Sequence, residues 1–274
     1  QKMLKEWKKK DLCIAANGTT YTKEKKGFLS ALMEKLYNER KMYKGKMIEA
    51  QKHRQNVGKM AMPTLAKGGV ANKLDKEITK YYNFQLVRKI QLNSCYGAIG
   101  NQYFRYYDVR QASGITTAGQ FIIRFIENKV NDYLNKVLAT TDVDYIIAAD
   151  TDSIYVRFDE LVSKVGPKNP VDFLDKVAKE KIEPYITKCY EELAKYVRAY
   201  DQKMVMAREV IADKGIWTAK KRYILNVHDS EGVRYAEPQI KVMGIEAVKS
   251  STPAPCREMI KSALKIIINE DEKT

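Results

Sequence analysis

The chain has 274 residues, of which 45% are hydrophobic, and carries a net charge of +15. The length allows one large domain or two smaller ones, and neither a membrane-spanning apolar run nor a secretory signal is visible. The four cysteines form no Cys-x-x-Cys pair and there are only two histidines, which argues for free thiols and against structural zinc. The positive charge favours a polyanionic partner, with nucleic acid ahead of a membrane surface, although a soluble basic protein without such a partner has the same composition.

After a basic start, the first third of the sequence is predicted to be helical. Residues 1–26 contain the turn signal Asn17-Gly18. From about Phe28, one stripe at helical spacing starts apolar and becomes basic, and it consists of Leu29, Met33, Leu36, Arg40, Lys44 and Met47. The far end of this helix is therefore expected to face an anion.

A second helix is predicted to pair with the first. Pro63 and Gly68-Gly69 indicate a connection, and a helical pattern then covers about Asn72–Tyr96. Gly97 and Gly100 are expected to end it. The two segments predict an antiparallel helical hairpin.

The rest of the chain mixes helices with strands. Helical patterns cover Thr116–Leu138 and Val171–Val197, the latter bent or restarted near Pro184. Four β-type runs are then expected, at Met204–Ile211, Arg222–Val227, Val233–Ala236 and Gln239–Ile245. A hairpin loop is expected at His228–Gly232, and Ser250–Pro253 is expected to start a last helix. This order predicts an α+β fold.

Asp150-Thr151-Asp152 lies between two short β-type segments, Tyr145–Ala149 and Ser153–Val156. Carboxylates at the tip of a strand pair are hard oxygen ligands, suited to Mg²⁺ that is held together with substrate phosphates. Aspartate is also common in ordinary polar turns, so the tripeptide alone leaves both interpretations open.

The second helix of the hairpin carries a polar stripe. Gln85, Lys89, Asn93 and Tyr96 share one face at helical spacing. Lysine suits phosphate charge and tyrosine suits packing on a base or sugar, so this face could grip a nucleotide. A solvated polar face has the same composition.

Two further groups are candidates for a nucleic-acid site. Glu209 could add a carboxylate to the acidic turn, or simply pair with a neighbouring cation. The run Lys220–Tyr223 opens a predicted strand with three cations, which would suit a nucleic-acid backbone or an exposed basic turn.

Three motifs in this order resemble the family B DNA polymerases, in particular the replicative polymerases of T-even-like bacteriophages. They are Lys89-x-x-x-Asn93-Ser94-x-Tyr96-Gly97, Asp150-Thr151-Asp152-Ser153 and Lys220-Lys221-Arg222-Tyr223. Shorter stretches such as Phe104–Asp108, Tyr235–Pro238 and Lys249–Pro253 resemble the same group. The resemblance covers nearly the whole chain.

The resemblance implies an α+β polymerase palm, in which helices flank an antiparallel sheet, with an inserted helical-hairpin fingers subdomain and the start of a thumb. By this comparison residues 1–28 and 100–252 are palm, 29–99 are fingers, and 253–274 begin the thumb. The implied reaction is DNA-directed DNA synthesis, in which the primer 3′-hydroxyl attacks the α-phosphate of a dNTP and pyrophosphate leaves.

The resemblance also implies residue roles. Arg40, Lys44 and Lys89 would contact the triphosphate, Asn93 would position them, and Tyr96 and Gly97 would line the pocket of the nascent base pair. Asp152 would be a direct ligand of one of two Mg²⁺ ions, Asp150 a supporting carboxylate and Glu209 an auxiliary acid. Lys220, Lys221, Arg222 and Tyr223 would hold primer–template DNA.

One departure from the family pattern concerns the metal site. The aspartate motif that precedes the fingers in the family is not found, and Ala207 replaces a second acid near Glu209. We therefore expect the chain to be inactive or weakly active alone, as part of a longer polypeptide or as a subunit of a split polymerase whose partner supplies the aspartate. A sliding clamp is a further implied partner, through a more C-terminal region, and the implied location is the cytoplasm of an infected bacterium.

Two alternatives stay open at the level of the sequence. A non-catalytic basic DNA-binding module would need only the positive charge and no metal. Another two-metal phosphotransferase or nuclease would use the acidic turn for cleavage instead of template-dependent synthesis.

Overall fold

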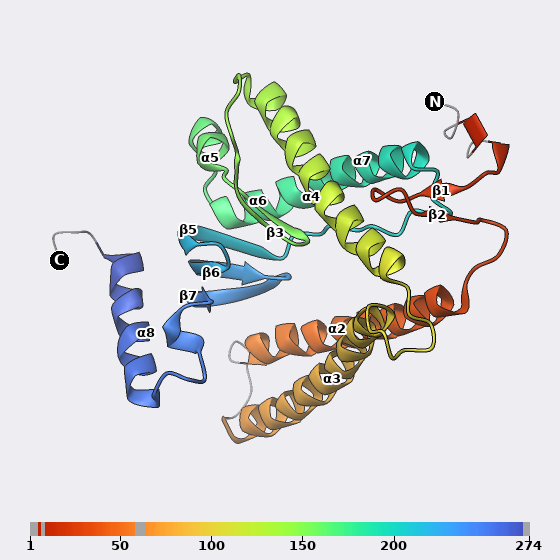
Figure 1. Ribbon diagram of the computed structural model, residues 1–274. Coiled ribbons are helices and arrows are strands. Elements are labelled where there is room, and N and C mark those ends of the chain that lie inside the picture. The colour runs from red at the N-terminus through yellow and green to blue at the C-terminus, as the bar shows by residue number, and fades with distance from the viewer. Residues whose placement is uncertain (1–4, 7–8, 58–63, 271–274) are drawn as a thin grey trace. The chain divides into compact units, whose positions relative to one another are not determined.

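The computed structural model describes residues 5–6, 9–57 and 64–270, with side chains from residue 68 onward in the last of these segments. It divides into two compact units, Gln1–Pro167 with Val177–Ala207, and Lys168–Lys176 with Arg208–Thr274. A long helical hairpin and small antiparallel sheets make a mixed α+β fold, as the sequence predicted (Figure 1). None of the helices in the described segments is long and apolar enough to cross a membrane.

The predicted helical hairpin is present in the first unit. It consists of α2 (Phe28–Val57) and α3 (Thr64–Ile99), which run antiparallel (Figure 1). The stripe predicted on the first helix is half-buried along its length, at Leu29, Met33, Leu36, Arg40, Lys44 and Met47. The face of α2 that helical spacing identified is therefore partly buried, and this includes its two basic residues, Arg40 and Lys44.

Three glycine-based predictions in this hairpin are wrong. Because α3 begins at Thr64, Gly68 and Gly69 lie within the helix and not in a connection, and Gly97 also lies within it. Only Gly100 follows the end of α3, as expected. A glycine costs a helix only about 1 kcal/mol relative to alanine, which the packing of two long helices can offset. Pro63 lies outside the described residues.

The core of the first unit forms where α4 (Val109–Leu138) meets a strand pair and α7 (Glu183–Tyr196). The strands are β3 (Ile146–Asp150) and β4 (Ser153–Val156), which pair antiparallel as predicted. Residues that recur at helical spacing on α4 are buried there: Ile126, Val130, Leu134 and Leu138. Tyr145, Ile146, Ile186 and Tyr190 complete the core from the other elements. The strand pair is thus fixed on a packed layer of helices.

One helix start differs from the prediction, one is confirmed, and one helix was not predicted. Helix α4 begins at Val109 and not at Thr116, because the Asp108 carboxylate accepts a hydrogen bond from the Arg110 backbone N–H and caps the helix. The predicted restart near Pro184 is confirmed, since a π-helical turn (Ala178–Ile182) separates α6 (Pro170–Val177) from α7. A short helix that was not predicted, α5 (Asp159–Val165), follows β4.

A small ribbon precedes the hairpin. Strands β1 (Cys13–Ile14) and β2 (Thr20–Tyr21) pair across the predicted Asn17-Gly18 turn, where Gly18 has a φ of +84°. The Asn17 side-chain amide donates to the Arg110 carbonyl at 3.0 Å. The ribbon is therefore attached to the first turn of α4.

The second unit contains a three-stranded antiparallel sheet in the order β5 (Val210–Ala219), β6 (Arg222–Ser230), β7 (Val233–Met243). The predicted run Met204–Ile211 is wrong for most of its length, because pairing with β6 starts only at Val210. The predicted five-residue loop is also shorter than expected. Its turn is Glu231-Gly232, and both residues have a positive φ, as a type I′ hairpin requires.

Strand β7 is continuous, although two runs, Val233–Ala236 and Gln239–Ile245, were predicted. The pairing of β6 with β7 shifts register between Val227 and Asp229, and Pro238 lies opposite this irregularity on an edge strand. A proline is tolerated there because its missing N–H breaks no ladder hydrogen bond. A short 3₁₀ turn (Glu246–Val248) and α8 (Ala254–Asn269) follow, the latter directly after Pro253 as predicted. Ile268 of α8 packs with Ile224, Ile245 and Ala247.

Candidate functional site

The acidic turn connects β3 directly to β4. Asp150 pairs with Ser153, so Thr151 and Asp152 form a two-residue turn. The Asp152 backbone N–H donates to the Asp150 carbonyl at 2.6 Å, and the Thr151 hydroxyl donates to the Asp150 carboxylate at 2.9 Å. Asp150 is half-buried and Asp152 is exposed. Two carboxylates therefore lie at one strand tip, the first held by the turn and the second open to solvent.

The conformation of Thr151 is unusual for its residue type. Its φ is +55°, in the left-handed region that β-branched residues rarely adopt. Such strain is typical of positions where surrounding structure imposes a backbone shape on a functional segment. Here the tight turn keeps both flanking carboxylates close together.

Side-chain hydrogen bonds from α4 hold the base of this strand pair, and sequence reasoning missed them. The Asn131 side chain of α4 accepts from the Tyr145 backbone N–H at 2.9 Å and donates to Asp144 at 2.9 Å. The Asn135 side chain donates to the Val143 carbonyl at 2.8 Å. These polar residues recur one helical turn apart on α4, but only the folded chain shows that they anchor β3.

Tyr190 is a second residue near the turn that sequence reasoning missed. It is buried at 3% exposure in α7. Burial raises the pKa of its hydroxyl, and the negative charge of Asp152 raises it further. The Asp152 carboxylate is therefore close enough to Tyr190 for their charges to interact.

The donor set at this turn fits one particular kind of metal binding. Mg²⁺ prefers oxygen ligands and is often held by one or two protein carboxylates together with substrate phosphates. Asp150 and Asp152 match that pattern. In the described part of the chain, no group of three histidine, cysteine or acidic side chains is arranged to hold a metal ion. These residues therefore fit an ion that phosphates or another segment help to bind, and not a self-contained metal centre.

The predicted polar stripe on α3 divides into a buried and an exposed part. Gln85 is buried at 8% exposure, whereas Lys89 and Asn93 are exposed and Tyr96 is 42% exposed. Gly97 is exposed in the last turn of the helix. The exposed part contains the cation, the amide and the aromatic ring that a nucleotide would contact.

On α2, Arg40 and Lys44 are half-buried one helical turn apart. The Arg40 Nε atom is buried and has no hydrogen-bond partner among the described residues. A buried guanidinium N–H without a partner is costly, and an anionic ligand would satisfy it.

An ion pair brings these two stripes to the same part of the hairpin. Arg88, next to Lys89, binds Glu39, next to Arg40, with 3.1 Å between Nε and Oε2. The structure thus places the α2 and α3 cations at a similar position along the hairpin axis. That these cations share one cleft with the acidic turn stays a prediction.

Glu209 lies in the second unit. Its carboxylate is 60% exposed and lies 3.6 Å from the Lys241 ammonium group. This is the cation pairing that the sequence left open. The auxiliary metal role of Glu209 stays a prediction.

The basic run Lys220–Tyr223 forms the β5–β6 turn and the start of β6. Lys220 and Lys221 are exposed, and Lys221 has a φ of +62°. The Arg222 guanidinium binds Glu246 at 2.6 Å, while Tyr223 is buried at 7% exposure beside Trp217. The turn itself therefore offers lysines to a partner, and Tyr223 mainly supports the strand.

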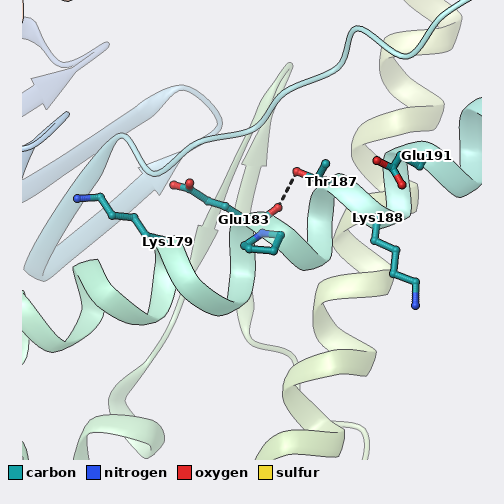
Figure 2. Close-up of a pocket in the computed structure, with 6 residues that line it drawn as sticks. Lys179, Glu183, Thr187, Lys188 and Glu191 are labelled. Atoms are coloured by element: carbon teal, nitrogen blue, oxygen red, sulfur yellow. Dashed lines mark hydrogen bonds between the residues drawn. The ribbon is translucent and has the colours of Figure 1, made fainter.

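One surface depression lies apart from every predicted site residue. It follows the π-helical turn and α7 and is lined by Lys179, Glu183, Pro184, Thr187, Lys188 and Glu191 (Figure 2). The Thr187 hydroxyl donates to the Glu183 carbonyl at 2.9 Å. Since a single helical stretch supplies both signs of charge, the depression indicates no ligand class.

Sequence comparisons connect the chain to proteins of known activity. Residues 59–166 match the family model described as DNA polymerase family B. The chain is 38% identical to a DNA-directed DNA polymerase of Escherichia phage RB69 in an alignment that covers 93% of this chain and 33% of the relative. It is 36% identical to a DNA-directed DNA polymerase of Enterobacteria phage T4 in an alignment that covers 94% of this chain and 34% of the relative.

By its sequence, the chain is similar to the family B DNA polymerases and, over most of its length, to phage DNA-directed DNA polymerases. The chain spans about a third of the length of both phage relatives. The matched family region contains all of α3, all of α4 and the acidic turn. The resemblance inferred from three short motifs is thus confirmed at the level of the family.

Proposed function

We propose that the chain forms the palm and fingers of a DNA-directed DNA polymerase. The observation that carries this proposal is the 38% identity to a phage DNA-directed DNA polymerase over 93% of the chain. In this assignment residues 29–99 are the fingers, residues 1–28 and 100–252 are palm, and residues 253–274 begin the thumb. The long α2–α3 hairpin and the small antiparallel sheets support it.

The hairpin would bind the incoming dNTP. Arg40, Lys44 and Lys89 would contact the triphosphate, because cations that form charge-assisted hydrogen bonds suit phosphate oxygens. Asn93 would position these contacts, and Tyr96 and Gly97 would line the pocket of the nascent base pair. The exposed Lys89, Asn93 and Tyr96 side chains and the buried Arg40 Nε without a partner support this role.

The acidic turn would hold Mg²⁺ together with the triphosphate. Asp152 would be the direct ligand and Asp150 the supporting carboxylate, with Glu209 as an auxiliary acid. Bound Mg²⁺ would neutralise phosphate charge during nucleotidyl transfer to the primer 3′-hydroxyl, in a site expected to use two ions. The side chains of this chain would orient the phosphates from the hairpin and hold the ion at the turn.

Primer–template DNA would contact the basic β5–β6 turn. Lys220 and Lys221 would bind the phosphate backbone, which fixes the position of DNA without reading its sequence. Arg222 and Tyr223 would hold the strand in place through Glu246 and Trp217.

We also propose that another segment or subunit completes the metal site. Two carboxylates at one turn, without a three-residue cluster in the described chain, support this view. A sliding clamp and a location in the cytoplasm of an infected bacterium follow from the same phage relationship as further proposals.

Primer extension tests the proposal. The chain would be mixed with the upstream portion of the RB69 phage relative and assayed with primer–template DNA, dNTPs and Mg²⁺. We expect Asp152→Asn to lower extension by a factor of 10² or more, on the order of the loss of one electrostatic catalytic group. DNA affinity and its salt dependence should stay unchanged, because a turn carboxylate neutralises no DNA phosphate.

Asp159→Asn is the matched control. Asp159 is a nearby aspartate with a side chain that is 78% exposed, paired only loosely with Arg157 at 3.9 Å. It should leave extension unchanged. DNA binding without extension in any mixture would favour the non-catalytic module, and Mg²⁺-dependent DNA cleavage would favour a nuclease. Extension by the isolated 274 residues at ordinary rates would contradict the proposed need for another segment.

A further inference from the structure

Arg88 of α3 makes two contacts with α2 and one within its own helix. Its Nε donates to the Glu39 carboxylate at 3.1 Å, and its Nη1 donates to the Phe84 carbonyl at 3.4 Å. Its guanidinium lies over the Tyr43 ring, 4.9 Å from the ring centre. Glu39 and Tyr43 belong to α2, so one side chain of α3 contacts two successive turns of the opposite helix.

Each of the three residues that join the two helices, Glu39, Tyr43 and Arg88, is followed by a predicted triphosphate contact. Arg40 follows Glu39, Lys44 follows Tyr43, and Lys89 follows Arg88. Successive residues of a right-handed helix are rotated by about 100° around its axis. Because α2 and α3 run antiparallel, the same rotation on both helices turns these three cations toward the same side of the hairpin.

The register of the two helices therefore decides whether the three cations form one site. A slip of one residue on a helix moves a side chain about 1.5 Å along the axis and rotates it by about 100°. Arginine is suited to holding the register of two helices, because its planar guanidinium can bind a carboxylate and stack on a ring at the same time. The contacts are partly shielded, with the Arg88 and Glu39 side chains 24% and 31% exposed.

We propose that Arg88 is a positioning residue for the nucleotide site. By holding Glu39 and Tyr43, it fixes Arg40 and Lys44 of α2 opposite Lys89 of α3. This inference rests on the proposed nucleotide-binding role of the hairpin, and assigns Arg88 no contact with the nucleotide itself.

A second ion pair of the same hairpin provides a matched control. The Arg54 Nε atom of α2 lies 2.9 Å from Asp75 of α3. It joins the same two helices, but Arg54 is about 20 Å from Arg40 along α2, given a rise of about 1.5 Å per residue. Arg54→Met thus removes the same type of cross-helix ion pair without changing the surroundings of Arg40, Lys44 or Lys89.

The test measures binding of a fluorescent dATP with Mg²⁺ and primer–template DNA by each variant of the full chain, in the mixture used for primer extension. Urea unfolding is measured for each variant of the chain by itself. Arg88→Met should weaken nucleotide binding by about 3- to 30-fold, the range typical of residues that act through others. Arg54→Met should bind nucleotide as the unmodified chain does. Arg88→Lys should restore only part of the affinity, because it keeps the charge near Glu39 but loses the planar stacking on Tyr43.

Lys89→Ala distinguishes failure of the positioning role of Arg88 from failure of the proposed nucleotide site. If Lys89→Ala weakens binding but Arg88→Met does not, the positioning role is overturned and the nucleotide site stands. Equal losses in Arg88→Met and Arg54→Met would also overturn it, because general weakening of the hairpin would then explain both. Unchanged binding in Lys89→Ala, or no binding by the unmodified chain, would instead overturn the proposed nucleotide site and the inference with it.

Discussion

At the scale of single residues, the acidic turn combines strain with exposure. Thr151 adopts a positive φ between two carboxylates, and only the second of these is open to solvent. The difference in exposure agrees with the roles proposed for the pair, in which Asp152 contacts the ion and Asp150 supports it. The Thr151 hydroxyl holds the Asp150 carboxylate at 2.9 Å, so the strained residue also orients the supporting acid.

Glu246 gives a residue-scale prediction for pH. The Lys249 ammonium group, a backbone N–H and the Arg222 guanidinium lower the pKa of Glu246 from 4.5 to about 2. A carboxyl with a lowered folded-state pKa adds stability above its unfolded pKa, and this stability is lost as the pH falls through the folded pKa. The difference in urea midpoint between the unmodified chain and Glu246→Gln should therefore shrink as the pH falls from 4.5 to about 2. A constant difference over that window would contradict the assignment.

At the scale of elements, two glycines have opposite roles. Gly45 lies within α2, and a Cβ added there meets nothing within 4 Å. Gly244 has a φ of +66°, and an added Cβ would collide with the Lys221 carbonyl next to the basic turn. The first glycine is therefore replaceable, whereas the second allows the chain to pass close to that turn.

This contrast predicts two changes of opposite sign. Gly45→Ala should raise the free energy of unfolding by about 0.5–1 kcal/mol, because alanine favours the helix and restricts the unfolded chain. Gly244→Ala should lower it by more than that, because both the backbone and the carbonyl must shift. Urea unfolding followed by circular dichroism measures both. A destabilising Gly45→Ala would show that α2 is packed on that face.

How much the sequence could predict also depends on the element. The hairpin and α4 were predicted because their apolar residues repeat over many turns, as Ile126, Val130 and Leu134 do. The acidic turn was predicted because both strands and both carboxylates are adjacent in sequence. Tyr190 and Asn131 were missed, since their contacts with the strand pair depend on how distant segments pack. The late start of β5 was missed because its pairing partner, not its composition, decides where the strand begins.

At the scale of the whole molecule, one charge network joins distant parts of the second unit. Arg208 binds both Asp175 of α6 and Asp229 of β6. Arg234 of β7 binds Asp229 at 3.1 Å and Asp172 of α6 at 2.8 Å. The Asp229 side chain is only 2% exposed. The network therefore ties α6 to the sheet through a buried carboxylate.

Removal of this carboxylate should unfold the second unit more easily. Asp229→Asn leaves the Arg208 charge without its buried partner, and we expect a loss of about 3 kcal/mol or more in unfolding free energy. Fluorescence of Trp217 in β5 reports the unfolding of this unit in a Trp7→Phe background. Glu258→Gln is the control, because the pair of Glu258 with Lys261 is exposed and should contribute about 0–0.5 kcal/mol. Equal effects of the two substitutions would contradict a structural role for the network.

The central claim is that the cationic hairpin and the acidic turn act on the same nucleotide. A crystal structure of the chain with primer–template DNA, a non-hydrolysable dNTP and Mg²⁺ tests it most directly. We expect triphosphate oxygens within hydrogen-bonding distance of Lys89 and a Mg²⁺ ion about 2.1 Å from an Asp152 oxygen, with the phosphates bridging the two. A nucleotide bound away from Lys89, or Lys89 and Asp152 on surfaces that share no cleft, would contradict the claim.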